Sequence, residues 1–419
     1  MGYSATRIGK VNFAAQSAWG TVAGSGWQTL QCEPPEFDFP TAAEEVNSIR
    51  SQLGAAPDYL KGHQADGSLT LKFRMHGLHG DGSSASADPT NTAESTLIKL
   101  CMGGQTIDNY VAAGVGTSST TTVLNVDSGP AYTLGAGIMM PYLSGGYTLY
   151  EPVVGRSVST NAITLLWPAR TAAPDDTAYT THGTITNYVT NDQPTPISVS
   201  IYGQEPGTSF SLLDCAVESL SIESTPAGWL QCTVTLKVGS WSQDTTSTTL
   251  ASFSYPNLPF LPVSVGYHGA SFGSHIQGTT SAVGELPCGS ITWDMTNELA
   301  PITGFDGMQG TVQYAITNRT IKVSGSISVS DWTGTNIQTS SVGAHSTDAT
   351  AYETMRLLVG DQPGNSLCIV IPRLSLTKYT PEDQGGIQGI GFEAIALDHS
   401  ADTTVASTPT NTPFRIIHC

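Results

Sequence analysis

The chain has 419 residues, with 16 Lys and Arg against 34 Asp and Glu, and its net charge is −18. A surface this acidic lacks the cations that neutralise phosphates, which argues against a nucleic-acid-binding protein. No run of apolar residues is long enough for a membrane span or a signal peptide, so we expect a soluble protein made in the cytosol.

Segments in which apolar and polar residues alternate occur along the whole chain. Such alternation predicts half-buried strands, because successive side chains of a strand point to opposite faces. The clearest segments are GSLTLKFR (67–74), ISVSIYG (197–203), VESLSIES (217–224), LQCTVTLKV (230–238), GSITWDM (289–295) and GSISVSDW (325–332). The sequence therefore predicts a mainly β protein.

Helical periodicity occurs in two short segments. They are Ala93–Met102 and Ala351–Val359, and each is followed by a glycine suited to a C-cap. We therefore expect two short helices.

The segments around these two helices recur in the same order. LQC (30–32), GSLTLKFR and the first helix match LPC (286–288), GSISVSDW and the second helix. The spacing from Cys32 to Gly67 is 35 residues, against 37 from Cys288 to Gly325. Downstream, QEPGTSFSLLDCAVESLSIESTP (204–226) matches DQPGNSLCIVIPRLSLTKYTP (361–381). These matches indicate an internal duplication.

The two copies differ by one block of extra residues in the first copy. Short strand patterns separated by glycine-rich turns fill this block, which favours a small inserted β domain at 106–186. A Ser/Thr-rich stretch containing prolines predicts a linker at 246–262. The first copy then comprises 1–105 and 187–245, and the second comprises 263–419.

Motifs that would carry chemistry are weak. His76, His79 and Asp81 have a spacing that a metal could use, but without further ligands polar histidines on a turn are the better interpretation. Ser271 lacks the GxSxG context of a hydrolase nucleophile. The seven cysteines lack metal-binding spacing and predict free thiols. We expect no enzyme activity, no metal and no cofactor.

The order of motifs resembles the major tail tube protein family of long-tailed, siphovirus-like bacteriophages. IGKVNFAAQSAWGTVAG, with its Trp19-Gly20-Thr21 turn, is similar to the family's N-terminal segment. A long loop, a GSLTL-type strand, a short helix ending in glycine and an inserted β domain follow in the family's order. The resemblance implies two similar β-sandwich or half-barrel tube domains, each with a short α-helix.

The resemblance also implies how the protein works. Six tube domains form a ring, so a duplicated chain implies trimeric, pseudo-sixfold rings that stack into a hollow cylinder. The cylinder would contain tape-measure protein and double-stranded DNA without binding either specifically, and would meet tail terminator and tail-tip proteins at its ends. The protein would be made in the host bacterial cytoplasm and reside in the virion tail.

Two long segments are the expected contacts between stacked rings. They correspond to the family's extended loop, and they span Glu44–Asp66 in the first copy and Ala300–Thr320 in the second. The candidate contact residues are Arg50, Tyr59, Lys61, Phe305, Tyr314 and Arg319.

Two other classes of function remain open. A tail-tip, capsid decoration or adhesin protein would share the Gly/Thr-rich β composition, and its candidate aromatic residues lie in the insert: Tyr142, Tyr147, Tyr150 and Trp167. A β-sandwich hydrolase would need a pair of carboxylates that the sequence does not identify.

Overall fold

The computed structural model describes most of the chain and shows a mainly β architecture. The described residues are 10–46, 58–64, 66–78, 92–108, 114–126, 132–166, 169, 172–174, 181–190, 192–203, 209–225, 228–244, 270–275, 284–286, 288–303, 311–328, 352–360, 364–383, 386, 388–397 and 412–419. The predicted linker at 246–262, together with His79, Asp81 and Trp167, lies outside them.

The first part of the chain contains fifteen strands and, among its described residues, one helix. These elements are β1 (Lys10–Ala15), β2 (Gln28–Leu30), β3 (Glu36–Asp38), β4 (Thr41–Val46), β5 (Asp58–Gln64), β6 (Gly67–Arg74), α1 (Ala93–Met102), β7 (Gly103–Asp108), β8 (Val123–Asn125), β9 (Gly137–Ser144), β10 (Tyr147–Ser159), β11 (Ala162–Leu165), β12 (Thr184–Val189), β13 (Ile197–Tyr202), β14 (Ser209–Ser224) and β15 (Gln231–Asp244).

The second part is described as strands only. They are β16 (Ala270–His275), β17 (Gly284–Leu286), β18 (Cys288–Thr303), β19 (Thr311–Ser328), β20 (Tyr352–Val359), β21 (Leu367–Asp383), β22 (Gln388–Ala396) and β23 (Arg415–His418). Among the described residues, no helix has the length and apolar character needed to cross a bilayer.

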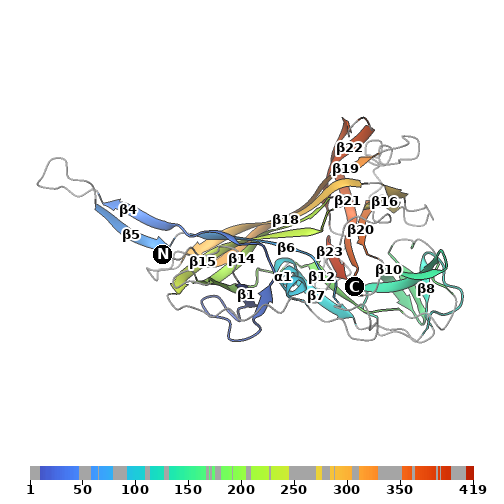
Figure 1. Cartoon of the computed structure of the whole chain (residues 1–419), viewed down its shortest axis with the longest axis horizontal. Coiled ribbons are helices and arrows are strands. Elements are labelled where there is room, and N and C mark those ends of the chain that lie inside the picture. Colours follow the sequence, from blue (N-terminus) through green and yellow to red (C-terminus); the bar gives the residue numbers. More distant parts are fainter. Residues whose placement is uncertain are drawn as a thin grey trace, which may run out of the picture.

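One antiparallel sheet runs through both parts of the chain. Its strands follow the order β3-β6-β15-β14-β18-β19-β22-β21. The junction between the two parts is the pairing of β14 with β18, from Ser219 opposite Thr296 to Ser224 opposite Ile291. In Figure 1 the long strands β14, β15 and β18 lie together in the middle of the molecule, while β19 and β22 rise at the upper right.

The first halves of β14 and β21 carry further strands. β14 pairs with β13, β13 with β1, and β1 with β2. β21 pairs with β20, β20 with β16, and β16 with β17. Each part of the chain therefore contains six strands paired in a row, β2-β1-β13-β14-β15-β6 in the first part and β17-β16-β20-β21-β22-β19 in the second. Strands at matching places in the two rows also come in the same order along the sequence.

Irregularities of the ladder also occur at matching places. β13 has a register shift between Ile197 and Val199 where it pairs with β14, and β20 has one between Glu353 and Met355 where it pairs with β21. β14 shifts between Val217 and Ser219 against β15, and β21 shifts between Leu376 and Lys378 against β22. Bulges of this kind are specific features of a fold.

The first predicted helix is confirmed, and its local sequence explains its limits. The Thr92 side chain accepts a hydrogen bond from the backbone N–H of Ser95 at 3.2 Å, which caps the N-terminus. At the other end Gly103 has φ +100°, and its N–H donates to the Lys99 carbonyl. The buried face of α1, with Leu97 and Ile98, packs into the main core.

The second predicted helix, at Ala351–Val359, is wrong, because Tyr352–Val359 forms strand β20. Met355, Leu357 and Val359 pack into the main core at alternate positions, while Leu358 between them packs into a second core, which is the alternation of a strand buried on both faces. β16 and β21 lie on either side and supply the backbone hydrogen bonds. In pairing order β20 corresponds to β13, and α1 has no helical counterpart among the described residues.

The extra block forms a small sheet of its own. The strands follow the order β8-β11-β10-β9, around a separate core that includes Leu124, Ile138 and Ile163. The chain enters and leaves this block through β7 and β12, which pair with each other. In that pairing Thr106 lies opposite Thr186, the two residues that bound the predicted insert.

The first predicted contact loop, Glu44–Asp66, contains a two-stranded hairpin, β4–β5. Its strands pair with each other and with no other described strand. Figure 1 shows this hairpin as an arm that projects away from the body of the subunit at the left. An isolated two-stranded hairpin is at best marginally stable in water, so the arm needs a partner.

A buried histidine makes the fold sensitive to acid. His418 is 1% exposed and neither ring nitrogen has a hydrogen-bond partner. Burial lowers its pKa from 6.5 to about 4, and Glu94 opposes this effect only weakly. Between pH 6.5 and 4 the unfolded chain therefore binds a proton that the folded chain does not, and stability falls as the pH falls.

We expect this histidine to cost roughly 3 kcal/mol of unfolding free energy between pH 7 and pH 4. Urea unfolding of the parent and of His418→Leu at pH 7 and pH 4.5 measures it. The variant should lose less stability over this interval. An equal loss in both proteins would show that other groups cause the acid sensitivity.

Candidate functional site

One face of the continuous sheet exposes polar side chains on many of the described strands. On β6, Leu69, Leu71 and Phe73 are buried, and the residues between them point to the opposite face. β15 repeats this alternation with Cys232, Val234 and Leu236 buried. Because strand side chains alternate, each strand contributes a row of polar residues to the opposite surface.

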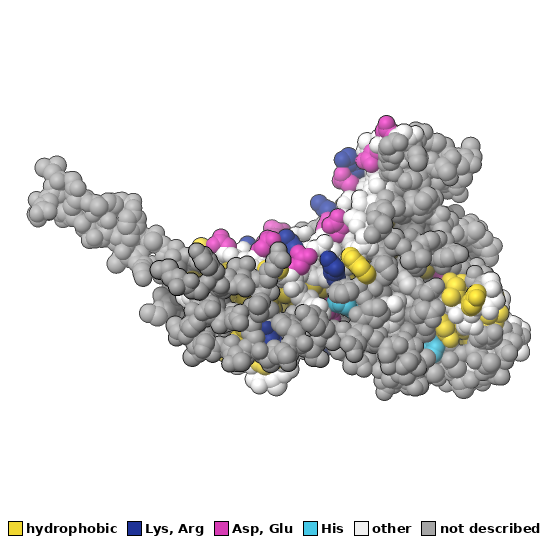
Figure 2. Space-filling model, viewed as in Figure 1, with side chains coloured by type: hydrophobic (Ala, Val, Ile, Leu, Met, Phe, Trp, Pro, Cys, Tyr) yellow, Lys and Arg dark blue, Asp and Glu magenta, His cyan; other side chains and the backbone are white. Residues whose placement is uncertain are grey.

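We call this surface the polar face. It combines hydroxyl side chains with acidic residues and a few lysines. Its members on the described strands are Glu36, Asp38, Ser68, Thr70, Lys72, Ser219, Ser221, Glu223, Thr233, Thr235, Lys237, Thr292, Asp294, Thr296, Lys322, Ser324, Lys378, Thr380 and Glu393. Figure 2 shows acidic and basic side chains together along the upper margin of the molecule, over these strands.

The polar face is continuous across the junction of the two parts. Directly opposed residues form a row that crosses seven strands. This row reads Arg74, Gln231, Glu223, Thr292, Ser324, Glu393 and Lys378. A neighbouring row reads Lys72, Thr233, Ser221, Asp294 and Lys322. In each row hydroxyl side chains lie in the middle, and one carboxylate lies directly opposite a lysine: Glu393 opposite Lys378 in the first row and Asp294 opposite Lys322 in the second.

Three of the four lysines of this face form ion pairs with glutamates. Lys72 Nζ lies 2.8 Å from Glu36 Oε1, Lys378 Nζ lies 2.8 Å from Glu393 Oε1, and Lys237 Nζ lies 3.4 Å from Glu218 Oε1. The hydrogen bond that Lys72 donates to Glu36 raises the pKa of Lys72, and the one that Lys378 donates to Glu393 raises the pKa of Lys378. Exposed pairs of this kind add little stability, but they neutralise the cations that would attract phosphates.

Two of the three predicted contact residues of the first copy lie on the arm. Tyr59 and Lys61 belong to β5, where Tyr59 pairs with Glu45 and Lys61 with Ala43. Arg50 lies outside the described residues.

The second predicted contact loop, Ala300–Thr320, is mostly strand, because β18 extends to Thr303 and β19 begins at Thr311. Tyr314 is only 1% exposed and its ring lies 6.1 Å from that of Trp19. Burial raises the pKa of Tyr314. Its assignment to a contact surface is therefore corrected, because β19 alternation directs this side chain inward. Phe305 lies outside the described residues.

Arg319 belongs to a joint inside the chain. Its Nε donates to Asn297 Oδ1 at 2.7 Å and a terminal nitrogen donates to the Thr190 carbonyl. Asn297 Nδ2 in turn donates to the Val217 carbonyl at 2.9 Å. Burial lowers the pKa of Arg319, and Asp192 opposes the shift. Arg319 thus connects β19 to the first part of the chain.

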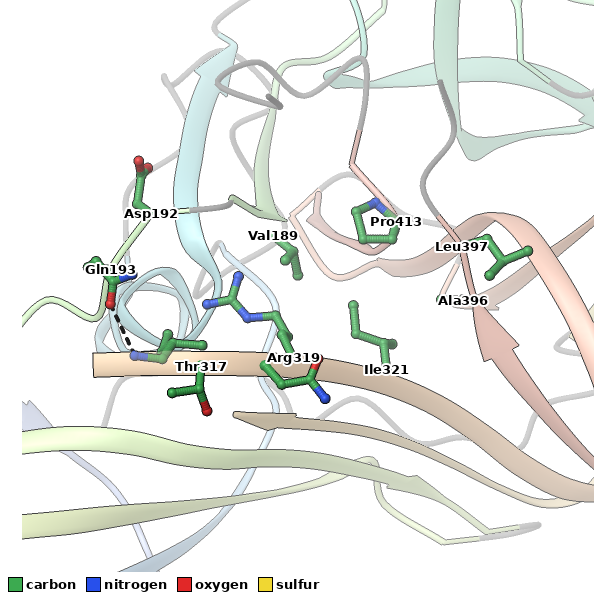
Figure 3. Close-up of a pocket in the computed structure, with 11 residues that line it drawn as sticks. Val189, Asp192, Gln193, Thr317, Arg319, Ile321, Ala396, Leu397 and Pro413 are labelled. Carbon is green, nitrogen blue, oxygen red and sulfur yellow. Dashed lines mark hydrogen bonds between the residues drawn. The ribbon is translucent and has the colours of Figure 1, made fainter. Parts of the chain in front are cut away.

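The pocket beside Arg319 lies along this joint. Val189, Asp192 and Gln193 line one side, and Arg319 and Ile321 line the other (Figure 3). The backbone N–H of Ile316 donates to Gln193 Oε1 at 3.0 Å across it. Because the side chains of Gln193 and Arg319 both bond to the chain itself, the pocket lies at a seam between two parts of the structure.

His76 has a structural partner. Its Nδ1 lies 3.3 Å from Glu94 Oε1, and both side chains are buried. Burial raises the pKa of Glu94, but hydrogen bonds from His76 and from the backbone outweigh it, and the pKa falls below its usual value. Among the described residues, no group of three or more His, Cys, Asp or Glu could hold a metal ion. The six cysteines whose side chains are described are free.

Sequence reasoning missed the polar face as a site. The alternation in each strand is visible in the sequence, but the cross-strand rows depend on register between distant segments. The ion pair of Lys72 with Glu36 joins residues 36 positions apart.

The chain matches no family model, and a search of curated proteins finds no significant match.

Proposed function

We propose that this chain is a structural subunit that assembles with copies of itself into the hollow tail tube of a long-tailed bacteriophage. The observation that carries the proposal is the recurrence of one strand order in two parts of the chain that join edge to edge in a single sheet. A sheet built from repeated units with open edges extends by adding more units, and closing it into a ring removes the edges.

The recurrence supports an internal duplication of a tube domain. Matching strand order, matching bulges and the LQC and LPC segments at the ends of β2 and β17 agree with one another. We assign 1–105 and 187–245 to the first tube domain, 106–186 to the insert and 263–419 to the second. In each domain the strands that branch from β14 or β21 would cover the apolar side of the main sheet, as in a sandwich.

The polar face is the proposed wall of the channel. Hydroxyl side chains are its most frequent members, and ion pairs hold three of its four lysines, so it offers phosphates little attraction. The face carries five carboxylates against four lysines and Arg74, so it has no excess of positive charge that would hold double-stranded DNA, and neither DNA nor tape-measure protein would bind to it specifically. Two domains per chain favour three chains per ring. The arm would contact the next ring, and terminator and tip proteins would close the ends of the tube in the virion.

A second candidate function concerns the insert alone. Tyr147 is 75% exposed and Leu143 is 48% exposed on the β9–β10 hairpin, and Figure 2 shows apolar side chains gathered over the insert strands at the right. This patch favours a binding role of the adhesin or tail-tip class. Of the other candidate aromatics, Tyr142 is buried. Selective binding of the full chain to a glycan array, lost in Tyr147→Ala, would support this role.

Electron microscopy of the concentrated protein tests the main proposal. We expect rings and stacked tubes with an open centre, because exposed sheet edges and an unsupported arm both need neighbours. A protein that stays monomeric at high concentration and under varied salt would contradict the proposal.

A further inference from the structure

At the junction between the two parts of the chain, a strand of the second domain pairs with the edge of a strand of the first. β13 pairs with β14 only from Phe210 to Cys215. Beyond that point β18 takes over the same edge and pairs with Ser219–Ser224. The second half of β14 is thus completed by a strand of the other domain.

The equivalent stretch of β21 has no such partner. β20 pairs with β21 only from Leu367 to Leu374, while β22 pairs on the other side as far as Asp383. The bulge before Lys378 matches the bulge before Ser219, so Lys378–Asp383 corresponds to Ser219–Ser224. No described strand occupies the free side of Lys378–Asp383.

Strand β3, which corresponds to β18 in the first part of the chain, also lacks a partner on one side among the described strands. β18 follows LPC and pairs with β19, and β3 follows LQC and pairs with β6. Matching Cys32 to Cys288 places Phe37 at the position of Trp293. β3 pairs with β6 from Glu36 opposite Thr70 to Asp38 opposite Ser68, and no register with another described strand is found for it.

We propose that β3 of one subunit pairs antiparallel with Lys378–Asp383 of the next copy of this chain, in the register of the β14–β18 junction. This inference rests on the proposed tube function and names the contact that closes the ring. The register places Asp38 opposite Thr380, Phe37 opposite Pro381 and Glu36 opposite Glu382.

Two of the three opposed pairs fit this register. The third pair, Glu36 with Glu382, sets like charges opposite each other, and the ion pair of Glu36 with Lys72 at 2.8 Å offsets part of their repulsion. Asp38 and Thr380 fall on the polar face, as their counterparts Asp294 and Ser221 do. On the opposite side Phe37 and Pro381 stand where Trp293 and Ile222 pair. Trp293 is 1% exposed whereas Phe37 is 44% exposed, the difference expected when one junction is covered and the other lacks its partner.

Neighbouring aromatic rings hold the side chain of Phe37 in place. Its ring stacks on Phe39 with centroids 4.9 Å apart and lies 5.2 Å from the ring of Phe210. A rigid exposed aromatic at an unpaired strand is a strong anchor for association. Pro40 and Pro381 lack backbone N–H groups, so this ladder has fewer donors than the β14–β18 junction and holds a single pair of chains more weakly.

Cross-linking tests the register. The Asp38→Cys and Thr380→Cys substitutions are placed in one chain, because opposed residues have Cβ atoms about 4.5–5.5 Å apart. A short bis-maleimide is then added to particles examined by electron microscopy. We expect covalent dimers and trimers on a denaturing gel, with nothing larger than a trimer. The matched control, Ser221→Cys with Asp294→Cys, should cross-link within one chain, and each single variant should give neither product.

The outcomes separate this inference from the proposed function. Rings that give no cross-linked dimers of the double variant, when the control closes, would overturn the pairing and leave the tube intact. Cross-linked dimers in linear assemblies that never close into rings would support the pairing and overturn the proposed tube function. Cross-linked products larger than a trimer on the gel would overturn the closure of a ring by three chains. Absence of both rings and dimers would overturn both proposals.

Discussion

Phe37→Asp is expected to abolish ring assembly while the subunit stays folded. The proposed junction buries the Phe37 ring, and an aspartate there would lose a central aromatic anchor and bury an unpaired charge. Truncating such an anchor costs at least about 2 kcal/mol per contact, or about 30-fold in affinity. Each ring contains the contact several times, so the losses multiply. Sedimentation velocity and electron microscopy measure the loss.

Three comparisons make this result specific. Phe37→Trp should assemble, because tryptophan occupies the matching position in β18. Tyr147→Asp, at a side chain that is 75% exposed on the insert, should also assemble. Phe37→Asp should lower the unfolding free energy by only about 1 kcal/mol through lost ring stacking. Normal rings from Phe37→Asp would contradict the junction, and a large loss of stability would show that Phe37 acts within the subunit.

Placing lysines on the polar face should make the tube retain DNA. Thr235 lies opposite Ser219, and Ser219 lies opposite Thr296, so Thr235→Lys with Thr296→Lys adds two cations where only hydroxyls meet. Each lysine that contacts a phosphate releases counterions and tightens binding in a salt-dependent way. Tubes assembled around linear duplex DNA should then hold DNA that resists nuclease, and parent tubes should not.

The matched control carries the same charge elsewhere. Thr121→Lys with Ser157→Lys adds two cations to exposed positions of the insert. Any DNA bound there should remain sensitive to nuclease, because it lies outside the channel. Nuclease-resistant DNA in parent tubes, or only sensitive DNA with the polar-face variant, would contradict the assignment of this face to the channel wall.

Local features of the fold were predictable from the sequence. GSLTLKFR is strand β6 over its full length, and the helix begins and ends at the predicted residues. Both segments carry strong local signals, which are strict alternation in one and a capping threonine and glycine in the other. The predicted helix at 351–359 is wrong because so short a segment fits both a helical and a strand period. Only the neighbouring strands β16 and β21 decide between the two.

The candidate site was harder to predict because it depends on contacts between distant segments. Nothing local to Ser219–Ser224 indicates that β18 covers this edge, and nothing local to Glu36 indicates Lys72 as its partner. Tyr314 and Arg319 were expected on a surface loop, but strand pairing turns the first inward and engages the second within the chain. Contact between the arm and the next ring remains a proposal.

The most direct measurement is a cryo-electron microscopy reconstruction of the assembled particle. The account predicts a ring of six similar β-domains from three chains, with the row from Arg74 to Lys378 facing an open channel and β3 paired with β21 of the neighbour. A particle in which this face points outward, or in which the two parts of the chain have unrelated folds, would contradict it.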